Sequence, residues 1–285
     1  MLNVLPVSVT KADGSRQMFD REKVVKTCLR MGANRRIAFD VADEVEARLY
    51  DGISTSKVLQ LTFRLLRKYK PAIHHVLDLR RGLSLMGSKP EFERFVQALL
   101  ARNGFEVTPN QLLTGKCVEH EVDAVARKDG VTYFVEAKHH LRYHTPTGLD
   151  ESRIARAILE DVTENFKLGR SSLKIDRAMI VTNTRYSEHA MRYGKCRNIL
   201  QIGWNSPANL SLQNMIEEKS LYPLSCLRGL KKEAKTKLVD SGVVLMEQLF
   251  EEKPSSLARR TGIQIETLKQ IMEKAKTSRI ASNNF

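Results

Sequence analysis

The chain has 285 residues, of which 42% are hydrophobic, and its 47 lysines and arginines against 33 acidic residues give a net charge of +14. This length predicts two or three domains with packed cores, and no apolar run approaches the roughly 20 residues of a membrane-spanning helix. The N-terminus lacks a charged region followed by an apolar stretch, so no signal peptide is expected. The positive charge predicts a polyanionic partner, nucleic acid before a membrane surface.

The four cysteines, Cys28, Cys117, Cys196 and Cys226, lie far apart and form no C-x-x-C pair. This spacing argues against a structural zinc site and against a disulfide framework. A reduced, cytoplasmic protein is the simplest expectation.

The first 88 residues show an α-rich pattern that begins with two short strands. These strands are expected within residues 4–20, around an Asp13–Gly14 turn. Asp20 is placed to cap a helix over 21–31. Further helices are predicted over 36–50, 55–68 and 72–85.

This order and four motifs resemble the ATP-cone, a nucleotide-binding regulatory domain of ribonucleotide reductases and their transcriptional repressors. The motifs are V-T-K-x-D-G at 9–14, F-D-R-E-K-V at 19–24, I-S-T-S at 53–56 and L-D-L-R-R-G-L at 77–83. The resemblance implies that Lys11, Lys23 and Thr55 bind ATP or dATP. Many cones carry arginine where this chain has Ala12, and the lost bidentate phosphate partner is expected to weaken or abolish binding. The alternative is a cone that serves as a protein–protein or DNA-contacting module.

Residues 88–90 are expected to be a linker, and an amphipathic helix follows over 91–103. Its predicted buried stripe consists of Phe92, Phe95, Val96, Leu99 and Leu100. A strand over 105–113 is expected to be broken by Pro109.

Residues 119–140 then read as a β-hairpin with an Asp129–Gly130 turn. The hairpin brings Asp123 and Glu136 close across the ladder. Lys138 lies two residues beyond Glu136 and therefore on the same strand face.

Two carboxylates and a lysine on one sheet face are typical of a metal-dependent phosphodiesterase site. Carboxylates about 4 Å apart repel by roughly 4 kcal/mol at an effective dielectric constant near 20, and a bound cation relieves that repulsion. Mg²⁺ is commonly held by one or two carboxylates plus waters. The alternative is an exposed hairpin with ordinary surface charges.

The segment from Glu91 to about Pro207 resembles the PD-(D/E)xK nuclease superfamily, in its Mrr-type restriction endonuclease branch. The resemblance rests on the helix E-F-E-R-F-V-Q-A-L-L, on E-V-D at 121–123, on E-A-K at 136–138, on A-M-I-V-T-N at 178–183 and on I-G-W at 202–204. It implies that Asp123 and Glu136 bind Mg²⁺ or Mn²⁺, that Lys138 assists the nucleophile, and that Glu93 adds an acid.

After the hairpin, His139, His140 and His144 are interpreted as substrate contacts or a solvated loop, because adjacent strand residues point to opposite faces. A long helix over 151–168 is predicted to turn Ile154, Ala157, Ile158, Val162 and Phe166 inward. Arg153 near its start either faces phosphate or lies on an exposed surface.

The remainder of this core is predicted as a strand over 176–182, a helix over 187–193 and a strand over 198–203. Trp204 either packs at the core edge or stacks on a base.

The tail over 210–276 is predicted to be helical. Its segment L-A-R-R-T-G-I-Q-I-E-T-L-K-Q-I at 257–271 resembles a helix–hairpin–helix element. Such a hairpin offers backbone N–H groups to phosphate, which implies DNA contact at Arg259, Arg260 and Gly262. A small helical protein-binding domain would show the same pattern.

We therefore expect an α/β multidomain protein: an α-rich ATP-cone at 1–88, a restriction-endonuclease-like α/β core with a mixed sheet at 89–208, and a helical domain at 209–285. The expected function is a Mg²⁺-dependent endonuclease acting on double-stranded or branched DNA, controlled by ATP or dATP. A homodimer or higher oligomer would cut both strands. The alternative is a nucleotide-responsive DNA-binding regulator with an inactive nuclease core, and RNA cleavage stays open.

Overall fold

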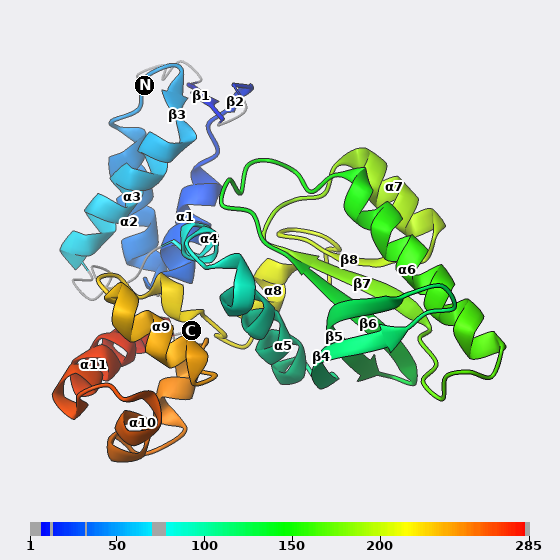
Figure 1. The fold of residues 1–285 in the computed structure, drawn as a ribbon. Coiled ribbons are helices and arrows are strands. Elements are labelled where there is room, and N and C mark those ends of the chain that lie inside the picture. Colours follow the sequence, from blue (N-terminus) through cyan, green and yellow to red (C-terminus); the bar gives the residue numbers. More distant parts are fainter. Residues whose placement is uncertain (1–6, 12–13, 32, 70–77, 283–285) are drawn as a thin grey trace. The chain divides into compact units, whose positions relative to one another are not determined.

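The computed structural model describes residues 7–11, 14–31, 33–69 and 78–282 (Figure 1). These residues group into two compact units. The first takes its described residues from 1–77, 227–230 and 264–285, and the second is formed by 78–226 and 231–263. Within the described residues, no helix is long and apolar enough to cross a membrane. The division into three domains at 88–89 and 208–209 stays a prediction.

The first unit combines a small sheet, in the order β2-β1-β3, with helices. Strand β1 pairs antiparallel with β2 and parallel with β3. Asp20 caps the first helix by accepting the backbone N–H of Glu22, as predicted. The elements are β1 (Ser8–Thr10), β2 (Arg16–Met18), α1 (Arg21–Arg30), α2 (Arg35–Glu46), β3 (Ile53–Ser54), α3 (Thr55–Tyr69) and α11 (Ile265–Ser282).

The core of the first unit lies between its three early helices. The inner faces of α1, α2 and α3 contribute buried residues to one apolar cluster, among them Cys28, Val41, Val45, Leu65 and Leu66. The predicted start of a fourth helix at Ala72 lies outside the described residues. The helix that is described, α4 (Leu79–Ser84), begins after its cap Asp78 and belongs to the second unit.

The second unit is built on a five-stranded sheet in the order β4-β5-β6-β7-β8. The first three strands are antiparallel, and β6, β7 and β8 are parallel, so the predicted mixed sheet is confirmed. The strands are β4 (Glu106–Thr114), β5 (Glu119–Lys128), β6 (Val131–Lys138), β7 (Arg177–Thr182) and β8 (Leu200–Ile202).

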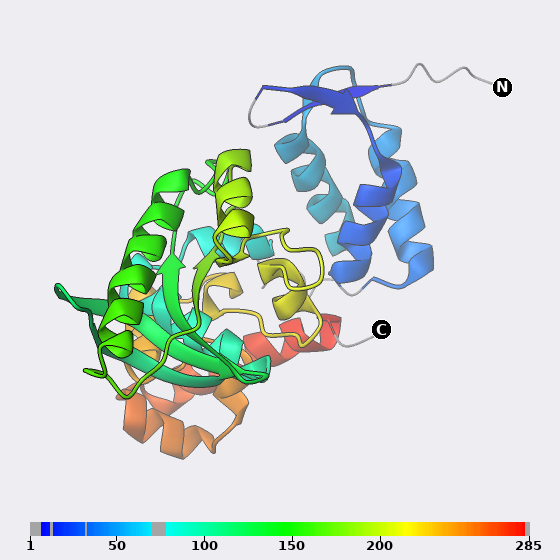
Figure 2. The same cartoon turned by 90° about the vertical axis from the view of Figure 1, so that its right-hand side faces the viewer.

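Helices cover both faces of this sheet. Figures 1 and 2 show α6 (Leu149–Lys167) and α7 (Glu188–Cys196) along one face and α5 (Glu93–Arg102) along the other. The α6 face buries Val125, Phe134, Leu159, Val162 and Ile180 together. A short kinked segment, η2 (Ser88–Phe92), in which Lys89 has an extended backbone, leads into α5 where a linker was predicted.

Two local expectations for this core were wrong. Strand β4 continues past Pro109, which is tolerated because β4 is an edge strand and one side of its backbone needs no partner. Ile154 and Ala157 do not point inward: Ile154 is 53% exposed, and Ala157 is exposed as well. The buried stripe of α6 runs instead through Ser152, Ala155, Leu159 and Val162.

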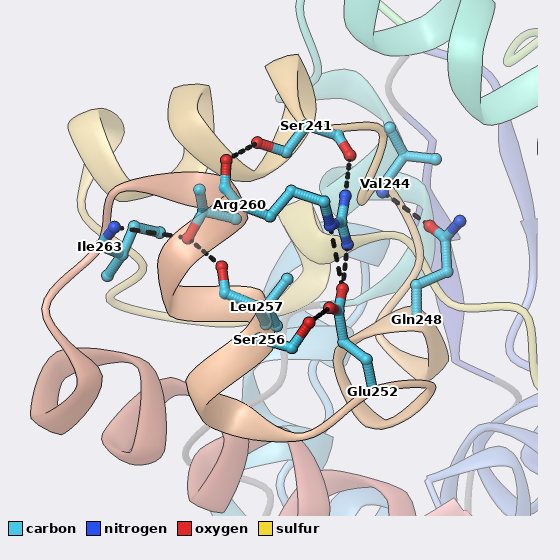
Figure 3. A network of polar contacts seen from close by, with 9 residues as sticks. Ser241, Val244, Gln248, Glu252, Ser256, Leu257, Arg260 and Ile263 are labelled. Carbon is cyan, nitrogen blue, oxygen red and sulfur yellow. Dashed lines mark hydrogen bonds and ion pairs between the residues drawn. The ribbon is translucent and has the colours of Figure 1, made fainter.

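Short helices follow the sheet in the second unit. They are α8 (Leu212–Glu217), η3 (Leu224–Cys226), α9 (Lys232–Asp240), η4 (Glu247–Phe250) and α10 (Pro254–Thr261). Figure 3 shows how α10 is held: the guanidinium of Arg260 binds the carboxylate of Glu252 and the main-chain carbonyl of Ser241. The predicted helical tail is therefore present.

Candidate active site

The four acidic and basic residues predicted for catalysis come from three neighbouring elements. Glu93 opens α5, Asp123 lies on β5, and Glu136 and Lys138 lie near the end of β6. The two strands pair as far as Ala124 opposite Val135, so Asp123 and Glu136 follow directly beyond the paired region. The hairpin expected from the sequence thus places both carboxylates at one end of the ladder.

Two hydrogen bonds hold Asp123 in this position. Its Oδ2 accepts the backbone N–H of Ala137 at 2.6 Å, and Ala137 is the residue between Glu136 and Lys138. Its main-chain carbonyl accepts the side-chain amide of Gln97 on α5 at 2.8 Å. One contact ties Asp123 to β6 and the other ties it to the helix that carries Glu93.

The carboxylates form a crowded acidic cluster. Burial raises the pKa of Glu93, and the negative charge of Asp123 raises it further. Burial also raises the pKa of Glu136; the charge of Lys138 opposes this effect and that of Asp123 adds to it. Lys89, whose Nζ lies 3.2 Å from Glu93 Oε1, offsets part of the negative charge. A bound cation would relieve the repulsion between these carboxylates.

Lys138 lies between two carboxylates. Its Nζ is 3.2 Å from Glu136 Oε2 and 3.5 Å from Glu151 Oε2. Burial acts to lower the pKa of Lys138, but the charges of Glu136 and Glu151 outweigh it and the pKa is raised. The lysine is therefore held as a cation, which suits a hydrogen-bond donor and charge stabiliser better than a general base.

Glu151 was not predicted as a site residue. It lies in the first turn of α6, 13 positions after Lys138 in the chain, and was assigned only to the start of a helix. No sequence spacing connects the two residues, since the intervening loop sets where α6 begins. An acidic residue in the first helical turn after an E-x-K strand is the only local signal.

The donor set fits a hard divalent cation. The carboxylates of Asp123 and Glu136, with that of Glu93 nearby, could offer oxygen ligands, and a positive ion would relieve their mutual repulsion. Across the described residues, no three His, Cys, Asp or Glu side chains form a ready-made metal cage. Mg²⁺ does not require one, because it commonly keeps several waters beside one or two carboxylates.

Two of the neighbouring histidines, His139 and His140, form hydrogen bonds within the protein, which corrects their interpretation as substrate contacts or solvated loop residues, whereas His144 is exposed in the loop after β6. The ring of His139 contacts the Leu83 carbonyl at 2.9 Å and the Ser88 hydroxyl at 3.2 Å. His140 contacts the hydroxyl of Thr147 at 3.1 Å through Nε2. Burial lowers the pKa of both histidines, so both rings are neutral near pH 7.

The predicted nucleotide-binding residues belong to the first unit. Lys11 follows β1 and is exposed, and Thr55 is the first residue of α3. Lys23 is exposed on α1, with its Nζ 3.7 Å from Asp20 Oδ2. Ala12, the departure from the cone pattern, lies outside the described residues. The nucleotide site therefore stays a prediction.

The predicted DNA-contacting residues differ in how far their polar groups are already used. The guanidinium of Arg260 is engaged in the network of Figure 3, and the N–H of Gly262 donates to the Ala258 carbonyl at 2.9 Å. Arg153 lies 3.2 Å from Asp150 on the surface. Arg259 is exposed on α10. Of this set, Arg153 and Arg259 present their charge most openly to a ligand.

Comparison with known proteins gives two family matches. Residues 86–202 match the restriction endonuclease model Mrr_cat, which confirms the predicted Mrr-type domain. Residues 222–277 match the model of the AF1548-like C-terminal domain. The match begins before η3 and extends into the last helix.

Similar proteins occur in Archaeoglobus fulgidus. One uncharacterized protein is 33% identical over 178 residues, covering 62% of this chain and 96% of that protein. A second is 50% identical over 38 residues, or 13% of this chain and 81% of its own length. A solved structure titled "Crystal Structure of Protein of Unknown Function AF1548" superposes with a TM-score of 0.57 at 32% identity, covering 65% of this chain and 94% of the other.

Proposed function

Because the chain belongs to the AF1548-like family and carries a Mrr-type restriction endonuclease domain, we propose that it is a metal-dependent DNA endonuclease. The observation that carries this proposal is the convergence of Glu93, Asp123, Glu136 and Lys138 at one end of the β5–β6 hairpin. A net charge of +14 suits a polyanionic substrate.

Each residue has a distinct role in the proposed reaction. Asp123 and Glu136 would hold Mg²⁺ or Mn²⁺, and Glu93 would support the same cluster. When bound, the ion supplies positive charge to the phosphoryl oxygens and lowers the pKa of a water. Lys138, kept protonated by Glu136 and Glu151, donates hydrogen bonds to the attacking water or to the charge that develops on phosphate.

We further propose that the first unit regulates this activity by binding ATP or dATP through Lys11, Lys23 and Thr55. The support is the cone-like order of a β-hairpin followed by helices, with Thr55 opening α3. Nucleotide binding would control assembly into a homodimer, in which two active sites cut both strands. Duplex and branched DNA are the proposed substrates.

The experiment that tests the activity uses labelled duplex, branched and single-stranded DNA with Mg²⁺ or EDTA, with and without ATP or dATP. Lys138→Ala is the inactive variant, and Arg170→Ala is a matched control because Arg170 is exposed beyond the far end of α6. Metal-dependent cutting by wild type and Arg170→Ala, lost in Lys138→Ala, is the expected result.

Other outcomes have a definite meaning. Tight DNA binding without cutting on any substrate would overturn the nuclease proposal and favour a DNA-binding regulator with an inactive core. Cutting that does not change with either nucleotide would overturn the proposed regulation and leave the nuclease in place. An RNA arm in the same panel decides between the two nucleic acids.

A further inference from the structure

A second cluster of basic and aromatic side chains lies in the same compact unit as the candidate active site. It consists of Arg80 on α4, Tyr143 in the loop after β6, Arg185 after β7 and Trp204 after β8, and we call it the Arg80 cluster. The guanidinium of Arg80 lies 5.0 Å from the ring centre of Tyr143 and 5.3 Å from that of Trp204. Two aromatic faces therefore frame one planar cation.

The hydrogen-bonding capacity of Arg80 is only partly used. One terminal nitrogen donates to the Tyr143 carbonyl at 3.0 Å. Its Nε is buried and has no hydrogen-bond partner among the described residues. A guanidinium has five N–H donors in a fixed fork, so leaving one of them buried and unpaired is costly unless an acceptor arrives.

The charge of the Arg80 cluster is also unbalanced. Burial lowers the pKa of Arg80, and the nearby positive charge of Arg185 lowers it further. Asp78 also acts on Arg80, but its carboxylate caps α4 by accepting the backbone N–H of Arg81 at 3.1 Å. The two arginines repel each other, and the one carboxylate nearby is partly engaged elsewhere. An anion bound between the arginines would balance their charge.

Strand topology places the Arg80 cluster at the same end of the parallel strands as Lys138. Strands β6 and β7 are parallel, and Lys138 lies opposite Thr182 in their register. Arg185 follows Thr182 by three residues, and Trp204 donates its backbone N–H to the Thr184 carbonyl at 2.8 Å. The ends of β6, β7 and β8 thus carry Lys138, Arg185 and Trp204 in turn.

We propose that Arg80 and Arg185 bind a backbone phosphate of the nucleic-acid strand, at a position other than the phosphate that is cleaved. Arginine suits this task because its planar fork matches phosphate oxygens and stacks on aromatic faces. Tyr143 and Trp204 orient the guanidinium of Arg80, and Arg185, which is exposed, contacts the phosphate from the solvent side. The identity of the strand rests on the proposed nuclease function.

Trp204 makes the test direct, because it is the only tryptophan of the chain. Wild type is titrated with a DNA duplex in EDTA, so that no cleavage occurs, while its fluorescence and the DNA affinity are followed over a range of salt concentrations. The variant is Arg185→Ala and the matched control is Arg170→Ala. Arg80→Lys is the second variant, since it keeps the charge but removes the planar fork.

Arg185→Ala is expected to reduce the magnitude of the slope of log affinity against log salt by about 1, the value for one lost phosphate contact. The DNA-induced change in Trp204 fluorescence should shrink in Arg185→Ala and in Arg80→Lys, and stay intact in Arg170→Ala. Equal slopes and equal fluorescence changes in Arg185→Ala and Arg170→Ala would overturn the site, as would wild type that does not bind DNA.

Failure of this site can be told apart from failure of the nuclease proposal. Wild type that never cuts DNA, together with a reduced slope in Arg185→Ala, removes the nuclease and supports the phosphate site. Wild type that cuts with Mg²⁺, together with an unchanged slope in Arg185→Ala, supports the nuclease and removes the phosphate site.

Discussion

Asp123 accepts a 2.6 Å hydrogen bond from the backbone N–H of Ala137, the residue that separates Glu136 from Lys138. The acidic ligand from β5 is therefore bonded to the strand that carries the other two site residues. This bond fixes the spacing of the carboxylates through the backbone, and it persists although the negative charges repel one another. The geometry leads to separable predictions for the charge and for the hydrogen bond of Asp123.

Replacing Asp123 with Asn is expected to abolish metal-dependent cleavage without destabilising the metal-free protein. The amide oxygen can still accept the Ala137 N–H, while the charge that raises the pKa of Glu93 and Glu136 is removed. Urea unfolding in EDTA should show a midpoint at or above that of wild type. Asp123→Ala loses the hydrogen bond as well, at a cost of about 1 kcal/mol. Retained cleavage in Asp123→Asn would contradict the assigned role.

Glu151 is predicted to position Lys138. In Glu151→Gln one of the two carboxylates that hold the ammonium group is lost, so kcat should fall by about 10- to 100-fold, as for other partners that orient a site residue. KM for DNA and the unfolding midpoint should change little. Glu160→Gln, which removes an exposed partner of Arg156 on the same helix, is the control. A rise in KM with unchanged kcat would exclude positioning.

A side chain at Gly82 is expected to destabilise the fold. A Cβ at this position would lie 2.3 Å from the Sγ of Cys226, so α4 and η3 would have to separate. Gly82→Ala should lower the free energy of unfolding by about 1–3 kcal/mol, the usual cost of overpacking. Adding Cys226→Ala removes the sulfur and should recover part of that loss in a double-mutant cycle. Strictly additive costs would show that the two residues do not share the space.

Ionised Asp161 is expected to stabilise the fold, and this stabilisation should be lost in acid. Its carboxylate contacts the His120 ring at 2.9 Å and accepts the N–H of Cys117 at 2.9 Å, and these bonds, His120 first, hold its pKa well below the ordinary value. A carboxyl group whose pKa is lower in the folded than in the unfolded state stabilises the fold at pH values above its unfolded-state pKa. That stabilisation is lost as the pH falls towards and through its folded-state pKa.

The Asp161→Asn variant tests this dependence. Its urea midpoint should lie below that of wild type at pH 7, and the gap should narrow once pH falls below the ordinary aspartate range. Midpoints measured at several pH values for both proteins check the prediction. A gap of constant size over the whole series would refute a contribution from ionised Asp161.

The four cysteines should divide into two reactive and two protected thiols. Burial raises the pKa of Cys28 to about 12 and that of Cys226 well above its ordinary value, and both side chains are buried. Cys117 and Cys196 are exposed. A thiol reagent should therefore modify two groups in native protein and four in denaturant. Asp161 raises the pKa of Cys117, so this thiol should react faster in Asp161→Asn.

Local sequence determined the central part of this fold. The Asp129–Gly130 turn and the period-2 strands on either side of it are short-range features, so they predicted the hairpin that carries Asp123, Glu136 and Lys138. The amphipathic helix carrying Glu93 was predicted for the same reason. Pro109 misled because its effect depends on whether a strand lies at the edge of a sheet, which no local pattern reveals.

Contacts between distant elements were decided only by the tertiary structure. Glu151 joins Lys138 only because α6 starts beside the end of β6. Arg260, expected to face DNA, is turned onto Glu252 (Figure 3). Turn chemistry and periodicity act over a few residues, so the sequence by itself determined the strands, helices and acidic pair. Packing of helices against the sheet sets the distances between side chains far apart in the chain, so it alone decided which charges meet.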